Sequence, residues 1–516
     1  MIPFDASSAF RPVAEGGHLR RLAIRGAAAT VSAQGLALAL QLVGTVVLAR
    51  LLTPADFGVV TMVTTFSLLL MNFGSNGFNE VVIQAEEMNR FQASNLFWIT
   101  SLAGLILTTA FAGAGSLLAR FYRNPLVAHV AVAMSVSIFL AAFCSIHLAL
   151  LRRAMRFRAV SANDVVGRVV YTTVAVLLAQ RGWEYWALVA GVIAQGLSMT
   201  IGAWSLCRWI PSLPRRGVGT RAIVRFAANV YVRFSMNYFS RNFDNVLIGW
   251  QFSAAALGFY KKAYDLFLLS ASQLTSPLNN VALAALSRLN QDPDRFRRYL
   301  VNSLGMLAFI GMAASADLTL VGRDVVRLVL GPKWSQSGRI FALFGPGIGV
   351  MLLYNTLGWI HLSVGKPERW LRWTFVESVA TAFLFILALP WGPAGIATAW
   401  TVSYWALSIP AFWYAGRPIG FGVSSLITAV WRYIGASLLA GLATAAIIRY
   451  TPFWGAPPNA KAALGAIIVI SALFVMLYLG AVIMLHQGCA PLRQLASLLS
   501  DIAPSKTATR PTAEPV

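Results

Sequence analysis

The feature that most constrains this chain is a series of apolar runs, each about as long as a bilayer is thick. A helix of about 20 apolar residues crosses the hydrocarbon core of a membrane, and the 516 residues contain fourteen such runs. Only 11% of the residues are charged, against about 25% in a soluble domain. The sequence therefore predicts an all-α polytopic membrane protein. The runs lie near residues 27–49, 57–79, 96–119, 126–151, 160–180, 183–207, 224–251, 258–286, 299–322, 338–364, 370–389, 393–416, 423–448 and 462–486.

The basic residues orient these spans. With fourteen crossings, 25 of the 41 Lys and Arg residues fall on one side of the membrane and 12 on the other. Because loops rich in Lys and Arg stay in the cytoplasm, we expect both termini there. The loops on the opposite side are short, the longest near residues 323–337. The other four basic residues, Arg168, Arg233, Arg241 and Arg432, lie inside spans.

Charge and composition also argue against several classes of function. A positive-inside bias accounts for most of the basic residues that give the net charge of +23. No basic stripe or nucleic-acid module is visible, so we expect no nucleic acid as a partner. The three cysteines and five histidines are scattered, which predicts neither a disulfide framework nor a metal site. We expect no cofactor. The first 26 residues lack the pattern of a cleavable signal peptide.

We expect the chain to divide into two helical halves with short additions. These parts are a cytoplasmic N-terminal segment (1–26), an N-terminal half (27–207), a cytoplasmic linker (208–223), a C-terminal half (224–416), an additional helix pair (417–486) and a cytoplasmic tail (487–516).

A repeat supports the two halves. The stretch "LARLLTPADFGVV" at residues 48–60 and the stretch "IGWQFSAAALGFY" at residues 248–260 align after a shift of 200 residues, with Gly58 opposite Gly258. The alignment holds without a gap for about 40 residues. It predicts parallel, pseudo-symmetric halves around a central cavity, although small-residue-rich spans can also align by chance. In the first copy, Pro54 and Gly58 suggest a tight turn between spans.

The seventh span carries a polar stripe. Asn229, Arg233, Asn237 and Arg241 recur at steps of four residues, and Asp244 or Asn245 follows. This spacing places them on one face of a helix, and arginines facing lipid would cost several kcal/mol. The stripe therefore predicts a lining of a water-filled cavity. The alternative is an internal pair of Arg241 with Asp244 that only holds helices together.

Further polar residues lie inside the spans. Asp164 and Arg168 are four residues apart, so a pair within their own helix is the simpler reading. Glu377 has no evident local partner and suits either ion coupling or a buried pair with an arginine of another span. Amide side chains suit sugar hydroxyls, although they equally form ordinary interhelical hydrogen bonds. The candidate glycan contacts are Gln41, Asn72, Asn76, Asn237, Gln273 and Asn279.

Several stretches resemble a known family. "VVLARLLTPADFGVVTMV", "MNFGSNGFNEVVIQ", "FDNVLIGWQFSAAALGFYKKAY", "ALAALSRLNQDPDRFRRYL" and "LGPKWSQSGRIF" follow one another in the order found in Wzx-type polysaccharide-repeat flippases. The likeness is to their colanic-acid-exporter-like branch, within the multidrug/oligosaccharidyl-lipid/polysaccharide exporter superfamily, and covers about residues 25–480.

This resemblance implies a transporter and not an enzyme. It implies an undecaprenyl-pyrophosphate-linked oligosaccharide as substrate, moved across the bacterial inner membrane for exopolysaccharide, capsule or lipopolysaccharide synthesis. Membrane lipids, a polysaccharide polymerase and a chain-length regulator are the implied partners. Since a diphosphate favours guanidinium groups, Arg233 and Arg241 are the first candidates to bind it, with Arg50, Lys261 and Lys262 as the second. Asp244 and Glu377 are candidates for ion coupling.

Three rival functions remain open at this point. A multidrug antiporter of the same superfamily would usually have twelve spans and an acidic cavity. A membrane glycan polymerase or ligase would need a large loop on the outer side. A scaffold for a synthesis complex would not need the stripe in the seventh span.

Overall fold

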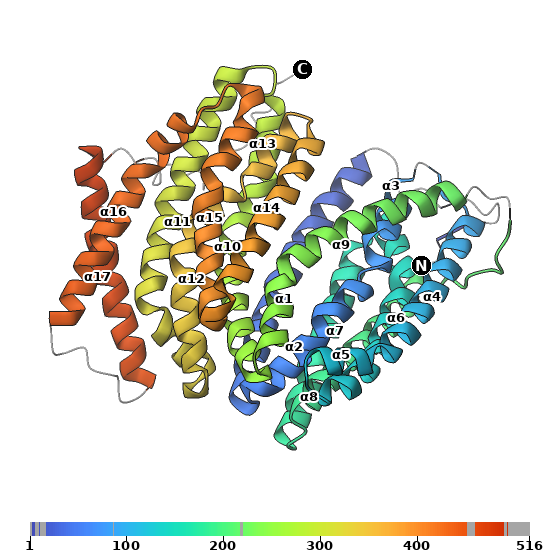
Figure 1. The fold of residues 1–516 in the computed structure, drawn as a ribbon. Helices are drawn as coiled ribbons and strands as arrows, with labels where there is room; N and C mark the ends of the chain where they lie inside the picture. The colour runs from blue at the N-terminus through green and yellow to red at the C-terminus, as the bar shows by residue number, and fades with distance from the viewer. Residues whose placement is uncertain are drawn as a thin grey trace, which may run out of the picture. The chain divides into compact units, whose positions relative to one another are not determined.

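The structure is a computed structural model, and it describes residues 3–5, 10, 17–85, 87–216, 220–450, 460–489 and 493. For residues 17–29, 75–76, 84, 221–222, 272–281, 284 and 460 it describes the backbone only. The described residues form helices and no β-strand. All fourteen predicted spans coincide with helices, which confirms the all-α polytopic fold (Figure 1).

The α-helices are α1 (Gly17–Leu51), α2 (Pro54–Met71), α3 (Asn79–Gln84), α4 (Arg90–Gly113), α5 (Gly115–Phe121), α6 (Leu126–Arg153), α7 (Phe157–Gln180), α8 (Tyr185–Cys207), α9 (Thr220–Gln251), α10 (Ala254–Arg288), α11 (Pro293–Leu330), α12 (Ser335–Tyr354), α13 (Leu357–Ser363), α14 (Pro367–Ala388), α15 (Gly392–Gly416), α16 (Val423–Tyr450) and α17 (Ala460–His486). The π-helix η1 (Gly74–Phe78) and the 3₁₀-helices η2 (Pro332–Trp334), η3 (Leu389–Trp391) and η4 (Arg417–Ile419) lie between them.

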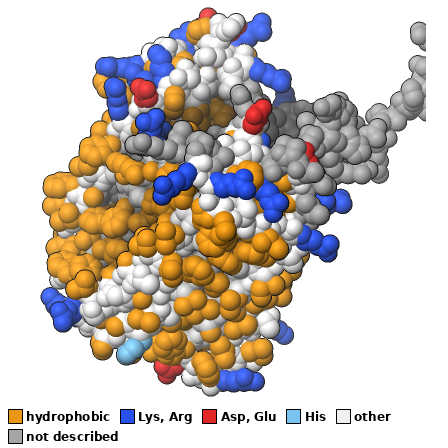
Figure 2. Space-filling model, turned by 90° about the vertical axis from the view of Figure 1, so that its right-hand side faces the viewer, with side chains coloured by type: hydrophobic (Ala, Val, Ile, Leu, Met, Phe, Trp, Pro, Cys, Tyr) orange, Lys and Arg blue, Asp and Glu red, His pale blue; other side chains and the backbone are white. Residues whose placement is uncertain are grey.

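Length and composition mark most of these helices as membrane-spanning. Eleven stretches of the described residues are long and apolar enough to cross a bilayer, and one of them, 367–419, contains both α14 and α15. The long helices α9 and α10 are not among the eleven. Figure 2 shows a broad hydrophobic area on one face, with Lys and Arg side chains mostly at its margins. The second copy of the repeat lies on α9 and α10, and this pair is thus more polar than α1 and α2, which carry the first copy.

Three predicted spans contain a break, and one predicted loop is mostly helical. The predicted span 57–79 breaks after Met71 into η1 and α3, the span 96–119 breaks at Ala114, and the span 338–364 breaks after Tyr354. The predicted outer loop 323–337 is mostly helical, because α11 continues to Leu330 and η2 follows at once. An average of hydropathy over a whole span does not resolve these breaks, although polar residues and glycines such as Asn72, Gly74 and Asn355 lie at them.

By its contacts the chain forms two compact units. Unit 1 contains residues 1–263, 329–340 and 378–396, and unit 2 contains residues 264–328, 341–377 and 397–516. In unit 1, α7 packs against α1 and α8, and α6 packs against α2, α4 and α8 (Figure 1). The division of the chain into functional halves that the sequence suggests stays a prediction.

Polar contacts hold the elements of each unit. In unit 1, the Asn95 side chain of α4 donates to the carbonyl of Arg215 and accepts from its N–H, which ties the predicted linker to α4. In unit 2, Asp317 of α11 accepts a hydrogen bond from Ser471 of α17 at 3.1 Å, and Tyr478 of α17 donates to the carbonyl of Phe309 at 2.7 Å. Hydrogen bonds between membrane helices of this kind fix which faces meet.

Candidate functional site

The two copies of the repeat form the same local structure in unit 1. In the first, Thr53 caps α2, accepting from the N–H of Asp56 at 3.3 Å, and Pro54 takes the first helical position. In the second, Ser253 accepts from the N–H of Ala256, also at 3.3 Å, at the start of α10. A hydroxyl at the N-cap satisfies a free backbone donor in both copies. Each copy is therefore a helix, a sharp bend and a capped helix, and we call residues 49–58 and 252–262 the two elbows.

The elbows pack against each other through their glycines. A Cβ on Gly58 would lie 1.7 Å from the carbonyl oxygen of Ala254, and a Cβ on Gly258 would lie 1.8 Å from the carbonyl oxygen of Pro54. The repeat aligns Pro54 with Ala254, so the contact is reciprocal, as at a two-fold interface. Gly58 was expected to ease a turn, and this was wrong. It lies inside α2 and permits two backbones to approach each other.

Trp334 of η2 contacts both elbows. Its indole nitrogen donates to the carbonyl of Ala49 at 2.8 Å, and its ring lies 5.4 Å from that of Phe57 and 6.0 Å from that of Phe259. The side chain is fully buried. The end of α1, the start of α2 and the start of α10 therefore share one aromatic centre.

The expected stripe on α9 separates into two parts. Arg233, Asn237 and Arg241 are exposed. Asp244 is fully buried, and its carboxylate accepts from the Tyr260 hydroxyl of α10 at 2.6 Å and from the N–H of Asn245 at 2.7 Å. In this structure Asp244 ties α9 to α10. Its predicted role in ion coupling, like that of the half-buried Glu377 on α14, stays a prediction.

The second group of diphosphate candidates lies at the elbows. Arg50 is exposed in the last turn of α1. Lys261 and Lys262 are half-buried in α10, and the Lys262 ammonium lies 4.0 Å from the ring centroid of Phe57. These cations thus lie close to the reciprocal glycine contact, and their role as anion contacts stays a prediction.

Among the glycan candidates, Asn72 and Gln41 have described partners. The Asn72 amide donates to the carbonyl of Leu68 at 2.7 Å, at the end of α2. The Gln41 amide oxygen accepts from Arg168 of α7 at 3.1 Å. The side chains of Asn76, Gln273 and Asn279 lie outside the described residues.

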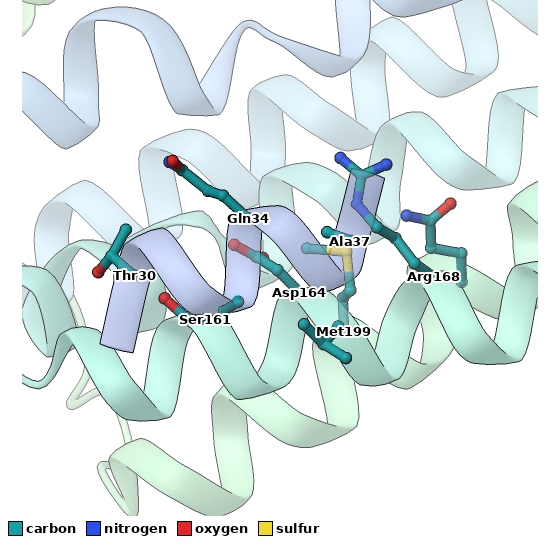
Figure 3. Close-up of a pocket in the computed structure, with 10 residues that line it drawn as sticks. Thr30, Gln34, Ala37, Ser161, Asp164, Arg168 and Met199 are labelled. Carbon is teal, nitrogen blue, oxygen red and sulfur yellow. The ribbon is translucent and has the colours of Figure 1, made fainter. Parts of the chain in front are cut away.

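A polar pocket of about 360 Å³ opens between α1, α7 and α8, all in unit 1 (Figure 3). Its polar lining comes from three helices that are each long and apolar enough to cross a membrane. The lining residues are Thr30, Ala33, Gln34, Ala37, Ser161, Asp164, Val165, Arg168, Gln195 and Met199.

The predicted ion pair between Asp164 and Arg168 within α7 is wrong. No ion pair joins these two described side chains, and Arg168 donates instead to Gln41 of α1. Both line the pocket. This pocket could not be predicted from the sequence, since it forms where α1 packs against α7, which lies far along the chain. The weak signal was a run of polar residues, Thr30, Gln34 and Gln41, on one face of the first span.

Close packing shapes this pocket. A Cβ on Gly202 of α8 would lie 1.9 Å from Oδ1 of Asn163, whose amide donates to the carbonyl of Met199 at 3.1 Å. A Cβ on Gly44 of α1 would lie 3.1 Å from Oγ1 of Thr172 on α7. Small residues let membrane helices approach closely. These contacts hold α7 close to both α8 and α1.

Comparisons with known proteins agree on the kind of protein. A family model described as "Polysaccharide biosynthesis protein" matches residues 47–339. The teichuronic acid biosynthesis protein TuaB of Bacillus subtilis is 23% identical over 60% of this chain, and the match spans 64% of that relative, a little under two thirds. The lipopolysaccharide biosynthesis protein WzxC of Escherichia coli is 21% identical over 72% of this chain and 75% of its own length.

Solved structures share the fold. The lipid II flippase MurJ in an inward closed conformation superposes with a TM-score of 0.71, at 14% identity over 90% of this chain and 99% of that one. An inward-facing multidrug resistance MATE family transporter gives 0.57, at 13% identity over 75% of this chain and 95% of that one. At such identities the likeness concerns the fold alone.

Proposed function

The chain belongs to the polysaccharide biosynthesis protein family, and from this premise we propose that it is a flippase for a lipid-linked oligosaccharide. The substrate is a glycan repeat unit on undecaprenyl pyrophosphate, and the product serves exopolysaccharide, capsule or lipopolysaccharide assembly. The relatives named for teichuronic acid and lipopolysaccharide biosynthesis support this class of substrate. The protein is a transporter in this proposal, and no covalent step is required.

The observation that carries the proposal is the exposed guanidinium pair on α9. Arg233 and Arg241 are exposed on a helix of membrane-spanning length whose polarity sets it apart from the eleven apolar stretches. An arginine in hydrocarbon costs at least about 2.5 kcal/mol, so we expect these side chains to face water or polar groups. A diphosphate offers guanidinium groups paired, charge-assisted hydrogen bonds. We assign the diphosphate of the substrate to Arg233 and Arg241.

The mechanism that we propose is alternating access. The diphosphate and glycan enter a polar cavity while the isoprenoid tail stays in lipid. The reciprocal contact of Gly58 and Gly258 then closes the elbow end, and it must separate when that end opens. Direction comes from an ion gradient or from polymerisation of the product, because a ligand shifts the equilibrium only through its different affinity for the two states.

The cellular setting follows from charge and from the substrate. The bias of Lys and Arg residues supports cytoplasmic termini, and a substrate carried on undecaprenyl pyrophosphate supports a location in the bacterial inner membrane. A polymerase and a chain-length regulator then act on the exported repeat unit.

The experiment is deletion of the gene followed by analysis of the lipid-linked sugars. We expect polymer export to stop and an undecaprenyl-linked oligosaccharide to accumulate on the cytoplasmic leaflet. Arg241→Ala should fail to restore export although the protein inserts at the normal level. Arg225→Ala, another exposed arginine of α9 nearer its start, is the matched control and should restore it. Unchanged glycolipids in the deletion strain, together with sensitivity to cationic drugs, would instead support a multidrug antiporter.

A further inference from the structure

We propose that the pocket between α1, α7 and α8 binds a sugar ring of the transported glycan. This inference rests on the proposed function and adds a subsite within one helix bundle. The pocket collects a carboxylate, a guanidinium, amides and hydroxyls from three helices (Figure 3). Polar groups of this density are costly among membrane helices unless they find partners.

The charges of the lining select against an ion as the ligand. Asp164 and Arg168 both face the pocket, so their formal charges cancel. A diphosphate would be repelled by the carboxylate, and a metal cation would be repelled by the guanidinium. No group of three or more His, Cys, Asp or Glu side chains among the described residues gathers to hold a metal. The pocket therefore suits a neutral ligand with many polar atoms.

A sugar ring matches the chemistry of the individual side chains. Each hydroxyl both donates and accepts, so it can donate to Asp164 and accept from Arg168. The amides of Gln34 and Gln195 offer both functions, and Met199 and Val165 offer an apolar wall for the C–H face of the ring. A volume of about 360 Å³ lies within the range of about 300–1,000 Å³ of small-molecule sites.

The pocket is also organised without a ligand. Arg168 is held by Gln41 of α1 at 3.1 Å, which directs its guanidinium away from Asp164. Asn163 and Gly202 hold α7 against α8. Because these groups are already placed, a sugar would not lose affinity to their ordering.

The test measures protection of a thiol in the pocket. Ser161→Cys is made in the full chain with Cys489→Ser, since Cys489 is exposed whereas Cys144 and Cys207 are buried. The protein in lipid nanodiscs is labelled with N-ethylmaleimide in the presence of glucose, N-acetylglucosamine, inorganic pyrophosphate or sodium ions. We expect one of the two sugars to slow labelling several-fold, whereas pyrophosphate and sodium leave the rate unchanged.

Two controls make the result specific. Ala162→Cys, on the neighbouring exposed residue of α7, should label at the same rate with every probe. Adding Ala37→Trp, which fills the pocket, should abolish the protection, whereas Ala39→Trp on an exposed position of α1 should preserve it. Protection by pyrophosphate or sodium alone, or by no probe, would overturn the inference.

A separate comparison distinguishes failure of the sugar subsite from failure of the proposed function. If deletion of the gene causes lipid-linked sugars to accumulate and the Ala37→Trp variant exports as well as Ala39→Trp, the flippase function stands and the sugar subsite is wrong. If no lipid-linked sugar accumulates on deletion, the proposed function itself fails, whatever the thiol shows.

Discussion

At the scale of single residues, Arg168 shows how tertiary structure redirects a side chain. Its nearest opposite charge along the helix is Asp164, four residues away, and such spacing favours a pair. In the structure the guanidinium reaches across to Gln41, 127 residues away in sequence. The packing of α7 against α1 brings this amide within reach. A carboxylate is thereby left facing the pocket.

A double-mutant cycle measures this contact. For Arg168→Ala and Gln41→Ala we expect a coupling of about 1 kcal/mol in the free energy of unfolding, since hydrogen bonds between membrane helices average about 0.6 and reach about 1.7 kcal/mol. The measurement is equilibrium unfolding of the purified chain in mixed micelles. A larger coupling of Arg168 with Asp164 than with Gln41 would restore the pair within the helix.

At the scale of elements, the elbows explain why both copies of the repeat keep a glycine at the same register. The carbonyl of the first helical residue in each copy fills the space where the glycine of the other copy would carry a Cβ. The sequence repeat therefore encodes a contact between the copies as well as a shared shape. The copies differ in their caps, with Asp56 in the capping box of α2 against Ala256 in α10, and each still makes its side of the contact.

The reciprocal contact makes a symmetric prediction. Gly58→Ala and Gly258→Ala should each destabilise the protein by about 1–3 kcal/mol, the usual cost of overpacking, because each Cβ meets a backbone carbonyl that cannot rotate away. Thermal unfolding measures the effect. The double variant should be clearly less destabilised than the sum of the single ones, since both changes open the same contact.

Matched controls test whether the effect belongs to the elbows. Gly35→Ala in α1 and Gly113→Ala in α4 place a methyl where nothing lies within 4 Å. They should leave the unfolding temperature unchanged or raise it slightly, because alanine favours helices. Equal losses in all four variants, or additive losses at the elbows, would contradict a reciprocal contact.

At the scale of the whole molecule, the distribution of basic residues predicts the orientation in the membrane. The bias of 25 against 12 Lys and Arg residues over fourteen crossings predicts that both termini lie in the cytoplasm. Polar α9 and α10 still count as crossings in this topology. Without them the number of crossings stays even, so the termini would not change sides, whereas loss of a single helix would reverse every later loop.

Reporter fusions check this orientation. Green fluorescent protein fused after residue 489 should fluoresce, since it folds in the cytoplasm. Alkaline phosphatase inserted between α16 and α17 should be active, since that loop is expected on the outer side and the enzyme needs an oxidising compartment. The reverse pattern for both fusions would overturn the orientation, and inactive phosphatase with a fluorescent C-terminus would show that α16 and α17 do not both cross.

The sequence by itself determined the class of fold and the places of the spans, because the bilayer demands long apolar helices and little else could satisfy fourteen such runs. It also determined the repeat, since both copies keep a hydroxyl at the helix cap and a glycine five residues later. It did not determine the breaks at Met71, Ala114 and Tyr354, because an average of hydropathy over a whole span does not resolve them. Only the tertiary structure decided that Gly58 serves a close approach, that Asp244 is buried against Tyr260, and that Arg168 turns to Gln41. These outcomes depend on which helix faces meet, and such contacts join residues far apart in the chain.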